Sequence, residues 1–291
     1  MLNKNIINRL AFIKYLYQQG IEQSYKAQPL CSQSILQFHD AIELFNQLAI
    51  EFKDIRSIDK SKINFDDYWK HLELTQRESM KRFNKARVGL KHYGIYPSRM
   101  DVESFRNCIT NFFIENTERI FSLDFDKISL IDLVSSEKAK FLLSGAERLL
   151  SEEKIEESLV ETKFAFHELM RNCEDIPIID QRFMRSYNHY DWRRSGLKDA
   201  HKIDSYFREL NNSIKSLHDT IRNIILGINY KKYLKFNLLT PHITYALDGT
   251  PHYYGGWWEP RDFPTIDEVK FCIDFVIEVA VVLQGSEFYK A

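Results

Sequence analysis

An arginine and a histidine five positions apart, Arg87 and His92, are the residues of this sequence whose types and spacing best suit chemistry. They lie in the stretch 85–96, which reads KARVGLKHYGIY. Arginine stays cationic and pairs with phosphate through two parallel hydrogen bonds, whereas histidine exchanges a proton near neutral pH. Lys91 and Tyr93 flank the pair and suit an exposed phosphate. The pattern therefore indicates phosphodiester cleavage that needs no metal.

The same pair also has a purely structural interpretation. Near the end of a helix, Arg87 can bond the last carbonyl groups, and His92 can cap the helix beside Gly94, where the helix dipole favours a cation. Both interpretations remain open on the sequence alone.

The composition predicts an all-α protein. The 291 residues contain only 10 Gly and 7 Pro, and this scarcity of turn residues favours long helices over a sheet-rich fold. The length suits one large domain or two ordinary ones. A formal net charge of -1 argues against a broad electrostatic grip on nucleic acid, so RNA binding would have to come from a local basic patch or from partner chains.

Neither a metal, a cofactor nor a membrane is expected. The four cysteines lie far apart and match no metal-ligand spacing. Lys4, Arg9 and Lys14 interrupt the amino-terminal apolar residues, which therefore predict an amphipathic helix rather than a secretory signal. The apolar run 275–283 is roughly half as long as a membrane span. These features predict a cytoplasmic protein.

Apolar periodicity divides the chain into two packed helical-bundle units, 1–127 and 128–291. Apolar residues at three- and four-residue steps predict helices over about 6–20, 35–52, 66–94 and 98–121 in the first unit. In the second unit we expect a helical hairpin within 141–169, a central helix over 203–228, and a last helix that begins after Thr265. The dipeptide Asp248-Gly249 predicts a small β-hairpin at about 236–254.

The second predicted helix carries a polar face that includes His39, Asp40 and Glu43. Such a face is usually exposed to solvent. The alternative is that one of these residues faces Arg87.

A stretch from 174 to 197 interleaves basic and aromatic residues without a clear period. Cations can meet phosphates while rings stack on bases, so this stretch is a second, weaker candidate for binding RNA. The alternative is that the rings fix an irregular connector to the core while the arginines stay in water. The residues concerned are Arg182, Arg185, Arg193, Arg194 and Trp192.

The helix 35–52, the motif KARVGLKHYG and the following amphipathic helix together resemble the HEPN superfamily, over about residues 30–121. Members of that superfamily are small helical domains with an arginine-to-histidine motif of this spacing at the start of their last helix. The resemblance implies a metal-independent endoribonuclease of a toxin or antiviral-defence system, in which two chains form a homodimer and their motifs meet in one cleft. A protein partner from the same operon is also expected.

The resemblance assigns a role to each residue of the motif. Arg87 takes the phosphate-binding place and His92 the acid-base place. Active members usually carry a polar residue directly after the arginine, where this chain has Val88; Asn84, Asp40 and Glu43 are the candidates to replace it. Many members are catalytically inactive and act as interaction or sensor modules, which is the alternative function.

Overall fold

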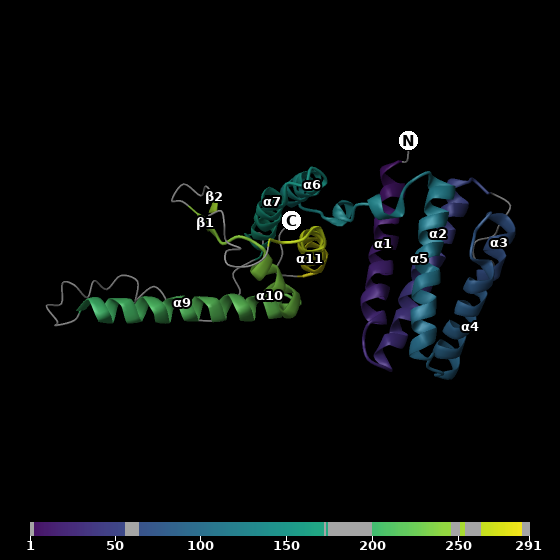
Figure 1. Cartoon of the computed structure of the whole chain (residues 1–291), viewed down its shortest axis with the longest axis horizontal. Helices are drawn as coiled ribbons and strands as arrows, with labels where there is room; N and C mark the ends of the chain where they lie inside the picture. The colour runs from purple at the N-terminus through teal and green to yellow at the C-terminus, as the bar shows by residue number, and fades with distance from the viewer. Residues whose placement is uncertain are drawn as a thin grey trace. The chain divides into compact units, whose positions relative to one another are not determined.

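The computed structural model describes residues 3–55, 64–171, 173, 200–245, 251–253 and 263–286. Over these residues the fold is all-α with one small antiparallel sheet, as predicted (Figure 1). The chain divides into two compact units, Met1–Leu133 and Val134–Ala291. In the described part of the chain, no helix is both long enough and apolar enough to cross a membrane.

Four long helices lie side by side in the first unit (Figure 1). They are α1 (Lys4–Ser24), α2 (Ser34–Phe52), α4 (Arg77–Tyr93) and α5 (Arg99–Phe121). The short helices η1 (Leu30–Gln33), η2 (Phe65–Asp67) and α3 (Tyr68–His71) lie in the connections between them. The periodicity correctly predicts α2 and α5, and Ser98 caps α5 in a capping box with Asp101.

One helix over 66–94 was expected, but the structure has two, α3 and α4. The chain is extended at Leu72, and Gln76 adopts a left-handed conformation with φ 59° just before α4. The buried side chain of Asn116 holds this break: its Oδ1 accepts a hydrogen bond from the backbone N–H of Thr75 at 3.0 Å, and its Nδ2 donates to the Thr75 hydroxyl at 3.0 Å. A tertiary contact therefore ends the helix where the local sequence would continue it.

Aromatic rings fill the core of the first unit. The ring of Phe45 on α2 meets Phe112, Phe113 and Phe121 of α5 edge-on, each at a centroid distance of 5.6 Å. Edge-to-face pairs at this distance are favourable beyond the apolar area that they bury. The core thus fixes α2 against α5.

The boundary between the units lies at 133/134 rather than at the predicted 127/128. The segment before it contains two short helices, η3 (Phe125–Lys127) and η4 (Ile131–Leu133). Phe125 stacks on Phe113 at 5.0 Å, and Lys14 of α1 donates to the carbonyl oxygen of Ile128 at 2.6 Å. These contacts keep the segment in the first unit although its sequence has no period.

The second unit is built around α11 (Ile266–Gln284), which is buried along most of its length and contacts α6 (Glu137–Ser151), α7 (Ile155–Arg171) and α10 (Tyr230–Leu239). Thr265 caps α11 as predicted. The prediction that the long helix α9 (Ala200–Ile225) would be the central one is wrong, because its apolar residues Leu217 and Ile224 are 55% and 56% exposed.

The β-hairpin is shorter than predicted. Strands β1 (Ile243–Tyr245) and β2 (Pro251–Tyr253) pair antiparallel, with Ile243 opposite Tyr253. Residues 236–239, which were expected in the hairpin, belong to α10 instead. The predicted turn at 248–249 lies outside the described residues.

Gly20 sets how closely α1 approaches α2. A Cβ atom at this position would lie 2.6 Å from two ring carbons of Phe38, which is fully buried. We expect Gly20→Ala to lower the free energy of unfolding of the first unit by about 1–3 kcal/mol, as overpacking does. The measurement is urea denaturation. Gly89→Ala on α4 is the control: its Cβ meets no atom closer than 3.9 Å, so it should be neutral or stabilising.

Candidate functional site

The candidate site lies where α2 faces α4. On α2, His39 and Glu43 are one helical turn apart, and Asp40 lies beside them. On α4, Asn84, Arg87 and Lys91 follow one another at three- and four-residue steps and therefore share one helical face. The two helices contact each other directly. These six residues, three from each helix, form the α2/α4 polar cluster.

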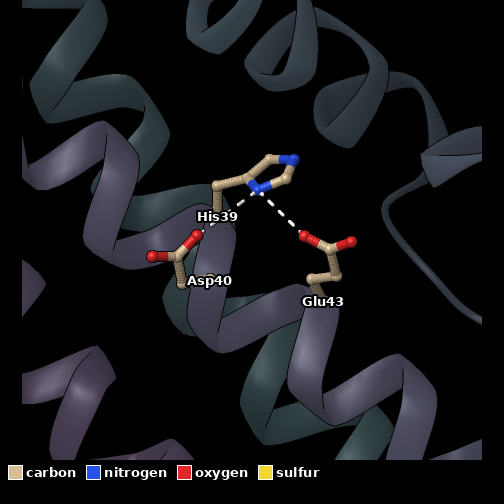
Figure 2. Close-up of side chains that lie close together, drawn as sticks. All are labelled: His39, Asp40 and Glu43. Atoms are coloured by element: carbon tan, nitrogen blue, oxygen red, sulfur yellow. Dashed lines mark ion pairs between the residues drawn. The ribbon is translucent and has the colours of Figure 1, made fainter. Parts of the chain in front are cut away.

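His39 is the buried member of the cluster. Only 4% of its surface is exposed, and its ring stacks on Phe65 at 5.1 Å and on Phe83 at 6.4 Å. Its Nδ1 lies 3.5 Å from a carboxylate oxygen of Glu43 and 3.9 Å from one of Asp40, as Figure 2 shows. The expectation that this polar face is exposed is therefore wrong for His39.

The pKa of His39 is lowered to about 4. Burial is the largest cause, and the positive charges of Arg87 and then of Lys91 act in the same direction. A hydrogen bond with the side chain of Asn84 opposes them. The imidazole of His39 is consequently neutral at neutral pH. These interactions also show that the face of α4 with Asn84, Arg87 and Lys91 is turned toward His39.

Arg87 is half-buried in the cluster, and its Nε has no hydrogen-bond partner among the described residues. A buried N–H group without a hydrogen-bond partner costs about 1–3 kcal/mol. A guanidinium held in this way is suited to an anion such as phosphate. The structure thus brings Arg87 and Lys91 together with Asn84, Asp40 and Glu43, five of the residues predicted to act together.

His92 is not brought into this cluster. It is exposed in the last turn of α4, five residues after Arg87, and at 3.6 residues per turn the two side chains point about 140° apart. Tyr93, 74% exposed, follows it at the end of the helix. The motif therefore occupies the end of α4 rather than the start of the last helix of the unit, which is where the resemblance placed it.

The second candidate surface cannot be placed against this site. Its residues Arg182, Arg185, Arg193, Arg194 and Trp192 lie outside the described residues.

His39 is the member of the cluster to which the sequence assigned no role. Its neighbours Phe38 and Ile42 belong to the apolar stripe that predicts the helix over 35–52, and a histidine between them lies at the edge of this buried stripe. The signal that could have found it is the four-residue step from His39 to Glu43, which places an imidazole and a carboxylate on the same face of a helix.

Comparisons with protein-family models, with curated proteins and with solved structures gave no match.

Proposed function

We propose that the first unit cleaves RNA without a metal, with Arg87 binding the scissile phosphate and His92 transferring protons. The observation that carries this proposal is the α2/α4 polar cluster, in which Arg87 is half-buried with an unpartnered Nε and Lys91 adds a second positive charge. The chain would act in the cytoplasm, with RNA and a further protein encoded in the same operon as its partners.

The proposed reaction uses the ribose 2′-hydroxyl as nucleophile. One imidazole removes its proton, the oxygen attacks the adjacent phosphorus, and an acid protonates the departing 5′-oxygen. The products are a 2′,3′-cyclic phosphate and a free 5′-hydroxyl. Arg87 stabilises the charge that develops on the phosphoryl oxygens. DNA lacks the 2′-hydroxyl and would not react.

A homodimer would reconcile this chemistry with the position of His92. Within one chain Arg87 and His92 point about 140° apart around α4. A second copy related by a two-fold axis would bring its own His92 toward the same phosphate and supply one imidazole for each proton transfer. His92 is exposed, as a residue that reacts with a substrate across a dimer cleft must be.

The test is cleavage of single-stranded RNA by the purified chain in the presence of EDTA. We expect products that end in a 2′,3′-cyclic phosphate, no cleavage of the matching DNA, and loss of cleavage in His92→Ala. His71→Ala is the matched control, because it removes another exposed histidine of the same unit. Equal cleavage by the wild type and His92→Ala would rule out the assigned role.

A second proposal, from another class, is a catalytically inactive interaction or sensor module. Its support is the end of α4: Gly94 has a φ of 65°, its N–H bonds the carbonyl of Leu90, and Lys91 and His92 occupy the last turn, where the helix dipole favours cations. These residues would then serve the helix end alone. A folded chain that binds RNA or a protein but never cleaves RNA would favour this proposal.

A further inference from the structure

His39, Asp40 and Glu43 place three metal-ligating atoms together on α2. The Nδ1 of His39 and one carboxylate oxygen from each acid all lie within 4.8 Å of one another. Figure 2 shows Nδ1 turned toward both carboxylates, at 3.5 Å from Glu43 and 3.9 Å from Asp40. The residues occupy two successive turns of one long helix, so their backbone positions are fixed by the fold.

The buried Nδ1 of His39 faces two carboxylates without a hydrogen-bond partner among the described residues. An unpaired buried polar atom costs about 1–3 kcal/mol, and here two carboxylates also face it. Three electron-rich atoms at these separations repel one another unless a proton or a cation lies between them. The unpartnered Nδ1 of His39, beside the two carboxylates, thus points to a ligand between the three side chains.

Asn84 holds the other side of the His39 ring. Its side chain hydrogen-bonds the His39 side chain. Because Nδ1 has no hydrogen-bond partner among the described residues, this bond is made at Nε2. Nδ1 is left facing the two carboxylates. Metal-binding histidines are oriented in the same way by a partner on their other nitrogen.

The donor set selects the kind of ion. One imidazole nitrogen and two carboxylate oxygens suit a divalent ion of the first transition row, whereas Ca²⁺ and Mg²⁺ prefer oxygen ligands alone. The ligand atoms must close to about 2.0–2.2 Å from the ion. The carboxylates of Asp40 and Glu43 are 65% and 45% exposed, so they are free to rotate toward it. Three protein ligands leave further positions for water.

We propose that His39, Asp40 and Glu43 bind a divalent transition-metal ion such as Mn²⁺ or Zn²⁺. Arg87 and Lys91 also face His39, and their charges weaken the binding of a cation while partly neutralising the two carboxylates. The site goes beyond the proposed function, because the cleavage chemistry uses no metal. No metal site was expected from the sequence.

The test measures binding of the metal alone, without RNA. The full chain is freed of metal with a chelator, dialysed, and titrated with MnCl₂ while free Mn²⁺ is followed by electron paramagnetic resonance; ZnCl₂ is titrated in parallel by calorimetry. We expect one ion per chain. Asp40→Asn and Glu43→Gln keep the side-chain shapes and are expected to weaken binding at least about tenfold. His39→Gln should do the same, with its fold checked by circular dichroism.

The control is Glu118→Gln, which removes an exposed carboxylate of α5. Glu118 lies near Phe121, whose ring contacts Phe52 at the end of α2 that is remote from His39. It should bind the ion as the wild type does. The proposal is overturned if the wild type binds neither ion saturably, or if Asp40→Asn and Glu43→Gln bind as tightly as it does. Failure of RNA cleavage in EDTA would contradict the proposed function and leave this result untouched, so the two failures are distinguishable.

Discussion

Replacing Arg87 with alanine is expected to slow RNA cleavage by about 10²–10³-fold, the usual effect of removing one group that stabilises a developing oxyanion. Arg87 is half-buried beside His39, where the low local dielectric strengthens its interaction with a phosphoryl oxygen. The measurement is the single-turnover rate of RNA cleavage in the presence of EDTA. Because the effect falls on the transition state, the rate should fall far more than the affinity for RNA.

Three variants separate this role from general effects. Arg87→Met keeps an unbranched apolar stem but removes the charge, so it should lose as much activity as Arg87→Ala while keeping the fold. Arg87→Lys keeps the charge without the fork of donors and should fall between wild type and alanine. Arg82→Ala removes an exposed arginine of the same helix and should leave the rate unchanged. A rate for Arg87→Ala equal to that of the wild type would place the chemistry elsewhere.

The helices were predictable because their information is local. A stripe of apolar residues at three- and four-residue steps is sufficient to predict α2 and α5, and pairs such as Ser98 with Asp101 mark where a helix begins. The end of α4 at Gly94 could be predicted for the same reason, since glycine adopts the left-handed conformation without strain. Pairing between helices leaves no comparable local signal.

The features that could not be predicted all depend on tertiary contacts. Asn116 interrupts the helix that was expected over 66–94, through hydrogen bonds to Thr75, which lies 41 positions earlier in the chain. The stripe of α9 predicts a helix and an apolar face, but it does not say whether another element covers that face. In the same way, His39 reads as part of a polar surface, because its burial comes from Phe65 and Phe83 of other segments.

The candidate site could be predicted only in part, because it too depends on tertiary contacts. The sequence offered Asp40, Glu43 and Asn84 as neighbours of Arg87, and the face of α4 that is turned to α2 brings these residues together. It also joined Arg87 to His92 by their separation along the chain. A spacing of five residues does not align two side chains on a helix, so only the three- and four-residue steps carried over into the structure.

In the second unit, Lys163 is a buried lysine, only 8% exposed, on α7. Its Nζ donates to the side-chain oxygen of Asn237 at 2.6 Å and lies 4.7 Å from the centre of the Phe236 ring. Burial lowers the pKa of Lys163 to about 8, from an ordinary value of 10.5. The folded chain therefore favours the neutral amine of Lys163 more strongly than the unfolded chain does.

This buried lysine makes the stability of the second unit depend on pH. Between about pH 8 and 10.5 the unfolded chain still binds the proton that the folded chain has released, so the free energy of unfolding rises with pH across this window. The gap between the two pKa values corresponds to about 3 kcal/mol. The thiol of Cys272 stays protonated there, because burial raises its pKa to about 12.

We expect urea denaturation at pH 7.5 to 10.5 to show this rise as a difference between the wild type and Lys163→Met, because groups common to both proteins cancel. Relative to that variant, the free energy of unfolding of the wild type should rise by about 3 kcal/mol between pH 8 and pH 10.5, and it should not change with pH below pH 8. Lys235→Met is the matched control: Lys235 also lies over a ring, that of Phe271 at 4.3 Å, but it is exposed, so its removal should not alter the slope. A difference between wild type and Lys163→Met that stays constant over this range would mean that Lys163 keeps its charge in the folded state, and that Asn237 and the Phe236 ring fully offset its burial.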